Sequence, residues 1–202
     1  MITNYFKRMW PEKTGEPLTN DWGTSMYYFE TDDLLAVLRQ VQVFENGQVL
    51  KYDREYLDDQ YGGLAEKALD AEDFEPYRIN SETFEQQWLL SSYRFPEIVC
   101  TPDTLWGQPR LQGRRLAVGD IVSLVDIYAE FPVVLEDFEL SLQQVRQALH
   151  YCKDLYCQKD STDLYCHNCS LSVEQDQSKL DEEDPGQDNW TRAARLFRTY
   201  FQ

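Results

Sequence analysis

The stretch from His150 to Cys169 constrains the fold of this chain most, because it holds four of the five cysteines. Cys152 and Cys157 are separated by four residues, and Cys166 and Cys169 are separated by two. Two pairs of thiolates at short spacing can occupy the four corners around a tetrahedral cation, as in structural zinc sites. The sequence therefore predicts a zinc site, and the free energy of metal binding, on the order of 10 kcal/mol, would also fold the loop.

Other interpretations of the cysteines stay open. Free thiols, a mixed site that uses His150 or His167, an iron–sulfur cluster or another thiophilic metal would fit the same stretch. If all four ligands are cysteines, no corner is left for a metal-bound water, so the metal would be structural rather than catalytic. Cys100 stands apart and is expected to be a small buried hydrophobic residue.

The chain is acidic, with a formal net charge of −17 over 202 residues. A surface of this sign repels nucleic-acid phosphates and anionic lipids, so a nucleic-acid role would need a local basic patch. The sequence has no run of about 20 apolar residues that would span a membrane, and its first residues lack the apolar core of a signal peptide. We therefore expect a cytoplasmic protein, in whose reducing environment clustered cysteines hold metal rather than form disulfides.

The predicted fold class is α+β, and changes in composition divide the chain into six segments. Prolines and glycines without periodicity indicate an arm at the start, and an acidic stretch almost free of apolar residues indicates a linker near the end. The segments are an N-terminal arm at 1–23, an acidic α+β domain at 24–98, a helix-turn-helix-like unit with a β-hairpin at 99–151, a zinc-binding cysteine module at 152–171, an acidic linker at 172–188 and an amphipathic helix at 189–202.

The acidic domain is predicted to contain an antiparallel meander of three strands. The aromatic run at 25–30 is typical of a strand. Asn46-Gly47 favours a type I′ turn, because both central residues of that turn need positive φ. The segments 34–45 and 48–53 should therefore pair as a hairpin.

Helices should follow the meander. A short one is predicted near 63–69, and Ser81 can cap a longer one that runs to about Ser91. The longer helix should cover one face of the sheet with the apolar side chains Phe84, Trp88 and Leu89.

A cluster of carboxylates follows the hairpin. Such a cluster could bind a divalent cation, and a metal-dependent nuclease is one interpretation. The simpler interpretation is a solvated turn, since nothing in the sequence makes these side chains converge. The residues are Asp53, Glu55, Asp58 and Asp59.

The first half also resembles a family of small uncharacterised bacterial α+β domains over residues 27–90. The stretches that carry the resemblance are YYFE, RQVQVFENGQVLKYDRE and YGGLAEKALD. This resemblance implies a fold and no activity.

The sequence pattern of the segment 99–151 predicts a small helical unit. Residues 106–115 read as a turn-rich hairpin, followed by a short strand at 116–118. Helical spacing of apolar residues then predicts helices at 118–127 and 133–138. Ser141 should cap a third helix, whose apolar stripe is Leu142, Val145, Ala148 and Leu149.

The stretches TPDTLWGQPRLQGRRLAV and LEDFELSLQQVRQAL, within 101–149, resemble the bacterial helix-turn-helix family called domain of unknown function 433, which is related to VapB-type antitoxins. The resemblance implies a small helical unit with an N-terminal β-hairpin and a homodimer that pairs through this hairpin. Two stretches depart from the family pattern. Gly113-Arg114-Arg115 replaces Gly-Thr-Arg, and the apolar Phe131–Val134 lies where the family has a polar stretch, which favours contact with a protein.

The residues of this unit that could contact nucleic acid or a partner lie on the hairpin and the third helix. Arginines of a hairpin can contact phosphates, and glutamine and arginine can read base edges. The same side chains are ordinary surface residues that pair with nearby carboxylates. They are Arg110, Arg114, Arg115, Gln143, Gln144 and Arg146.

The final segment, NWTRAARLFRTYFQ, predicts a basic amphipathic helix. It is either a docking helix for a partner or a helix that folds back onto the acidic half of its own chain. The residues concerned are the aromatic Trp190, Phe197 and Phe201 and the basic Arg192, Arg195 and Arg198.

These features together favour a non-enzymatic adaptor or regulatory protein that is stabilised by zinc and acts through protein contacts. The alternative is a DNA-binding transcriptional regulator or antitoxin-like protein, and the second alternative is the nuclease. No glycine-rich phosphate loop or nucleophile–base pair supports an enzyme.

Overall fold

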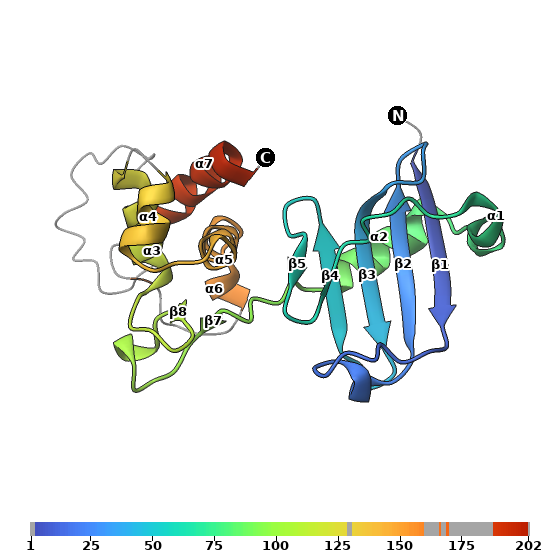
Figure 1. Cartoon of the computed structure of the whole chain (residues 1–202), viewed down its shortest axis with the longest axis horizontal. Helices are drawn as coiled ribbons and strands as arrows, with labels where there is room; N and C mark the ends of the chain where they lie inside the picture. Colours follow the sequence, from blue (N-terminus) through green and yellow to red (C-terminus); the bar gives the residue numbers. More distant parts are fainter. Residues whose placement is uncertain (1–2, 129–130, 160–165, 167–168, 170–187, 202) are drawn as a thin grey trace. The chain divides into compact units, whose positions relative to one another are not determined.

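The computed structural model describes residues 3–128, 131–159, 166, 169 and 188–201. The protein is α+β, and it divides into two compact units, unit 1 (Met1–Arg94) and unit 2 (Phe95–Gln202) (Figure 1). The boundary falls a few residues before the predicted division between 98 and 99. Among the described residues, no helix is both long and apolar enough to cross a membrane.

Unit 1 is built on an antiparallel sheet of four strands that follow one another in sequence order (Figure 1). The strands are β1 (Asn4–Trp10), β2 (Ser25–Thr31), β3 (Val37–Phe44) and β4 (Val49–Asp53). Strand β1 shows that the predicted arm at 1–23 is wrong. Its Phe6 is buried with Phe29 and Phe74. The prolines and glycines that suggested an arm all lie after Trp10, in the connection to β2.

The hairpin between β3 and β4 is confirmed, but its turn differs from the predicted one. The Gly47 amide donates to the Phe44 carbonyl at 2.9 Å, and Gly47 has a φ of +86°. Asn46 is not among the residues with positive φ, so the turn is not type I′. The loop is instead a tight turn followed by a left-handed glycine, which is the other common short hairpin connection.

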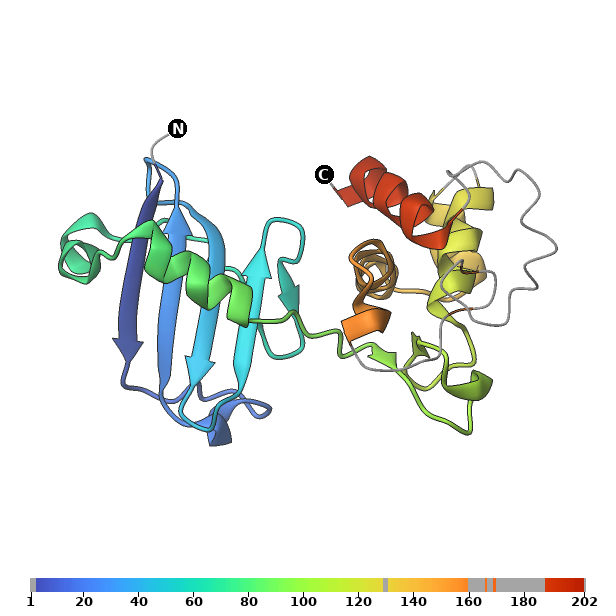
Figure 2. The ribbon, with the colours of Figure 1, turned by 180° about the vertical axis from the view of Figure 1, so that it is seen from behind.

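Helix α2 (Ser81–Leu90) covers one face of the sheet, as Figure 2 shows. Its cap is Asn80 rather than Ser81, since the Asn80 side chain accepts from the Thr83 amide at 2.8 Å. Phe84 is fully buried on the sheet, and Trp88 packs beside it. Leu89 is 81% exposed, so its predicted place on the sheet is wrong.

The short helix predicted near 63–69 is absent. Gly62–Gly63 forms β6, which pairs with β5 (Asp58–Asp59). The next amides are used elsewhere: Ala65 donates to the Gln40 side chain at 3.0 Å. The helical turns of this unit are α1 (Ala71–Phe74), η1 (Asn20–Trp22) and η2 (Glu75–Tyr77).

Unit 2 consists of a small hairpin and a group of helices. The elements are β7 (Ile98–Val99), η3 (Leu105–Gly107), β8 (Arg110–Leu111), α3 (Val118–Ile127), α4 (Phe131–Asp137), α5 (Leu142–Lys153), α6 (Tyr156–Lys159) and α7 (Asn189–Phe201). Helix α3 has the predicted bounds, and α4 begins two residues before the predicted Val133. The strand predicted at 116–118 is only a single bridge between Ala117 and Arg110.

The cap of α5 is confirmed in detail. The Ser141 hydroxyl accepts from the Gln144 amide, and the Gln144 side chain accepts from the Ser141 amide, each at 3.0 Å. This reciprocal capping box satisfies two amides that the helix leaves free. Helix α5 is the centre of unit 2, because both α3 and α7 pack against it (Figure 1).

The Lys51 side chain in unit 1 closes the C-terminal end of α2. Its Nζ donates to the carbonyls of Trp88 and Ser91 at 3.0 and 3.1 Å. It also lies 3.9 Å from the centroid of the Trp88 ring. A cation at this position complements the dipole of the helix and the face of the indole.

Lys51→Met is therefore expected to lower the free energy of unfolding by about 2 kcal/mol, because two carbonyls lose a charged donor. Urea unfolding followed by fluorescence measures the loss. The matched control is Lys67→Met at an exposed lysine, which should change stability by no more than about 0.5 kcal/mol. Equal effects of the two substitutions would show that the contacts of Lys51 contribute nothing specific.

Candidate metal-binding cysteine cluster

The four cysteines of the predicted module come together in unit 2. Cys152 lies in the last turn of α5, Cys157 lies in α6, and Cys166 and Cys169 come from the chain that follows. All four line one cavity of about 20 Å³, roughly the space of one water molecule. The other lining residues are Pro109, Val118, Tyr151, Leu155, Asn189 and Trp190.

Gly119, in the first turn of α3, forms part of the surface beneath the cysteines. Its amide donates to Cys166 Sγ at 3.3 Å. A Cβ atom at this position would lie 2.8 Å from Cys166 Cβ and 2.9 Å from Asn189 Nδ2. Only glycine therefore lets these groups approach α3 so closely.

The surroundings of the cluster disfavour the ionised form of its thiols. Burial, together with the neighbouring cysteines, raises the pKa of Cys152 well above its ordinary value. Burial also raises the pKa of Cys166 to about 12, although the Gly119 amide opposes this change. Several thiolates cannot share this space without a positive charge, and a bound cation reverses the balance by deprotonating the thiols that coordinate it.

In the described part of the chain, no group of at least three His, Cys, Asp or Glu side chains has an arrangement that could hold a metal ion. The zinc site and its knuckle therefore stay predictions. The chemistry of the donors fits zinc, since thiol sulfurs are the donors that closed structural sites use. The shared cavity is what the structure adds to the spacing of the cysteines.

The two histidines of the stretch have separate outcomes. His150 is 1% exposed, and its Nε2 lies 2.9 Å from Asp154 Oδ2. Its ring packs between Phe95 and Phe197, with centroid distances of 5.5 and 5.4 Å. His150 is thus part of the packing around α5, whereas His167 lies outside the described residues.

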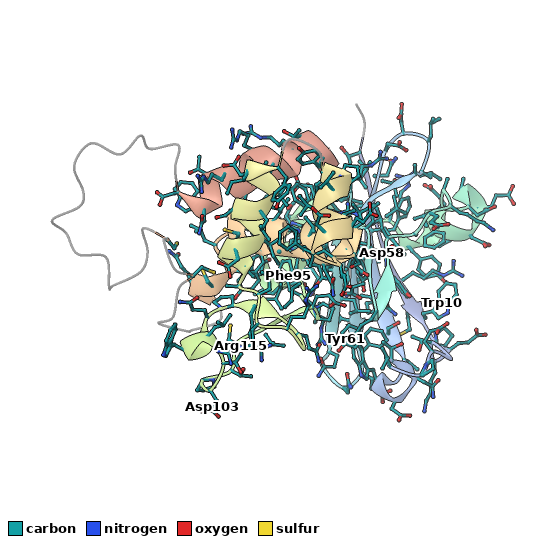
Figure 3. The ribbon with its side chains drawn as sticks, turned by 60° about the vertical axis from the view of Figure 1, so that its left-hand side comes forward. Trp10, Asp58, Tyr61, Phe95, Asp103 and Arg115 are labelled. Carbon is teal, nitrogen blue, oxygen red and sulfur yellow. The ribbon has the colours of Figure 1, made fainter. Side chains whose placement is uncertain are left out.

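Two of the three hairpin arginines bind the backbone of their own unit. Arg110 Nη1 donates to the carbonyls of Leu111 and Arg114, each at 3.0 Å. Arg114 donates to the carbonyls of Phe138 and Glu139, just after α4 ends. Arg115 is exposed, on the loop labelled in Figure 3. The predicted cluster is therefore not a set of three equivalent surface arginines.

The polar side chains of α5 are also engaged within unit 2. Gln144 Nε2 donates to a Glu97 carboxylate oxygen at 3.2 Å. The Arg146 guanidinium lies 5.6 Å from the Phe201 ring centroid. From Gln143 to Lys153, no side chain of α5 is exposed. The polar face of the third helix is therefore partly covered by its own unit.

Helix α7 packs on its own chain, the second of its two predicted roles. Its buried residues include Ala193, Leu196 and Phe197. Trp190 is 37% exposed, and Phe201 packs edge-on against Phe131 at 5.9 Å. The helix packs on α5 and α3, within unit 2.

The arginines of α7 differ in their contacts. Arg192 Nε lies 3.2 Å from an Asp126 carboxylate oxygen, and Arg195 pairs with the other oxygen. Arg198 is exposed and donates to the Ala194 carbonyl one turn earlier. Two of the three arginines therefore attach α7 to α3.

The carboxylates that follow the hairpin of unit 1 stabilise turns. Asp53 accepts from the amides of Glu55 and Tyr56, each at 2.8 Å. Asp59 accepts from the Tyr52 hydroxyl at 2.8 Å, and burial raises the pKa of this carboxyl. Asp58 is exposed, at the position labelled in Figure 3. These contacts match the simpler interpretation of a turn more closely than a cation site.

Fold and site together define an α+β protein whose helical unit carries a cluster of cysteines. Comparison with known proteins relates that helical unit to a family. Residues 98–152 match the family described as "Protein of unknown function (DUF433)", which confirms the resemblance seen at 101–149. The resemblance at 27–90 and the homodimer through the hairpin stay predictions.

A curated relative that matches part of the chain is the "Uncharacterized protein Rv2308" of Mycobacterium tuberculosis (strain ATCC 25618 / H37Rv). It is 41% identical over 59 residues, which are 29% of this chain and 25% of the relative. The chain thus spans only about a quarter of the length of this relative. No solved structure matches the chain.

Sequence reasoning missed the residues that surround the cysteines from outside the module. Gly119 lies 47 residues before Cys166, and Asn189 lies beyond the predicted acidic linker, so the spacing of the cysteines cannot reveal either residue. The one signal in the sequence is a glycine in the first turn of a helix that is rich in apolar residues. Such a glycine often marks a close approach of another segment.

Gly119→Ala tests the close approach of Cys166 and Asn189 to α3, because that approach determines whether the substitution raises or lowers stability. Alanine in place of glycine inside a helix normally stabilises it by about 1 kcal/mol. Here the added Cβ would collide with Cys166 and Asn189, so we expect a loss of about 1–3 kcal/mol. Thermal unfolding measures the change, with Ser123→Ala in the same helix as the control. A variant as stable as the wild type would contradict the close packing of these residues.

Proposed function

We propose that this protein is a non-enzymatic adaptor or regulatory protein, stabilised by a structural zinc ion, that acts through contacts with other proteins. The observation that carries the proposal is the single small cavity lined by Cys152, Cys157, Cys166 and Cys169. Four thiolates would complete a tetrahedral zinc site and leave no open position for water or substrate. Zinc would then supply structure rather than chemistry.

The packing of other elements around α5 supports a function in binding proteins rather than in binding DNA. The helix that would enter a DNA groove is enclosed by its own unit, and the chain carries a net charge of −17. Non-specific attraction to phosphates normally supplies the first part of DNA affinity. An enclosed helix on an acidic chain has little of this attraction.

An exposed tryptophan in unit 2 offers a surface for a partner. Trp106 is 79% exposed. It lies in a turn where Leu105, Trp106 and Gly107 all have positive φ, of 49°, 53° and 82°. Tryptophan is enriched among the residues that dominate binding at protein interfaces, and strained backbone of this kind clusters at functional sites. Both properties support a role of this turn in a protein contact.

The zinc part of the proposal predicts about one zinc ion per purified chain. Elemental analysis by mass spectrometry, together with titration of the thiols, measures it. Cys166→Ser should lose the zinc because a closed site needs all four ligands. Cys100→Ser, outside the cluster, is the matched control and should keep it. Less than about half an equivalent of zinc with four freely titrating thiols would exclude the site.

A DNA-binding regulator is the second candidate, favoured by the family match over 98–152 and by the exposed Arg115. Fluorescence anisotropy with a random-sequence duplex at about 50 mM salt tests it, since electrostatic binding is strongest there. We expect no binding at micromolar protein. Binding that weakens as salt is added, and that Arg115→Ala reduces, would favour the DNA-binding role over the adaptor.

A further inference from the structure

The first residues of α7 form one wall of the cysteine cavity. Asn189 and Trp190 line it together with the four cysteines. Asn189 is 2% exposed, and its Nδ2 lies close to the position that a Cβ of Gly119 would take. The cysteine cluster therefore contacts three elements at once: the end of α5, the start of α3 and the start of α7.

The rest of α7 fills a groove on unit 2. Phe197 is fully buried, and its ring lies 5.4 Å from that of His150 on α5. Tyr200 stacks on Phe131 at a centroid distance of 4.5 Å. The Asp126 carboxylate on α3 receives Arg192 and Arg195 at the side of the groove. Apolar packing and charge thus both fit α7 to this place.

Helix α7 lies outside the segment that matches the family. The match ends at residue 152, and α7 begins at Asn189. The helix therefore covers α5, which belongs to the matched segment, as an additional element. An isolated helix of 13 residues is only marginally stable in water, so α7 depends on this groove and on whatever holds its first turn.

We infer that metal binding by the cysteine cluster is a latch that seats α7 in the groove between α3 and α5. This inference rests on the zinc site of the proposed function. A metal held by the four thiolates would offset part of their negative charge and fix the wall against which Asn189 and Trp190 pack. Without the metal, that wall is lost, α7 leaves the groove, and the apolar side of α5 is uncovered.

Hydrogen–deuterium exchange of the full-length protein, with zinc bound and after its removal by a chelator under reducing conditions, tests the latch. Peptides from 189–201, from α3 and from the sheet of unit 1 are followed separately. Phe197→Asp, which puts a charge into the buried groove, defines the exchange of a released α7. Thr199→Ala, at an exposed position of the same helix, should behave as the wild type.

The expected result is loss of protection in 189–201 on removal of zinc, to the level of Phe197→Asp, while α3 and unit 1 keep theirs. Equal protection of α7 with and without bound zinc would overturn the latch but leave the zinc site in place. Loss of protection in α3 together with α7 would also overturn it, because the metal would then hold the whole of unit 2. A protein that binds no zinc would overturn both the latch and the zinc site.

Discussion

The enclosure of α5 is the constraint on which unit 2 depends. Helix α3 and helix α7 pack against it. Phe95, which is labelled in Figure 3, meets the rings of His150, Tyr151 and Tyr156 at centroid distances of 4.7–5.5 Å. A helix covered in this way is stabilised by packing rather than by its own propensity. Its capping box at Ser141 sets where it begins, and the first cysteine lies where it ends. The cysteine cluster is thus placed by the same helix that organises the unit.

This enclosure changes what the family resemblance can imply for function. A helix-turn-helix unit that reads DNA needs an exposed polar face on its second helix. In this chain, Gln144 caps its own helix and bonds to Glu97, while Arg146 lies over Phe201. Two of the side chains predicted to read bases therefore attach α5 to its surroundings. The family match therefore does not by itself assign DNA recognition to this unit.

Local signals in the sequence predicted local structure well. The bounds of α3, the cap at Ser141 and the hairpin around Asn46-Gly47 depend on neighbouring residues, and each was recognisable. Features that depend on distant pairing were not. Strand β1 exists because Phe6 finds Phe29 and Phe74. Likewise, the spacing of the cysteines predicted a cluster, but Gly119 and Asn189 became visible only once the chain had folded.

Two segments that are far apart in the sequence, Phe131–Val134 and the C-terminal helix, pack against each other in the structure. The apolar stretch at Phe131–Val134 lies within the segment that matches the family, and the aromatic tail lies beyond that segment. Separately, each suggested a surface for a foreign protein. In the structure, Phe131 lies against Tyr200 and Phe201, at 4.5 and 5.9 Å. The apolar stretch therefore receives α7, and under the proposed adaptor function a partner would use a surface that α7 leaves free or one that its release uncovers.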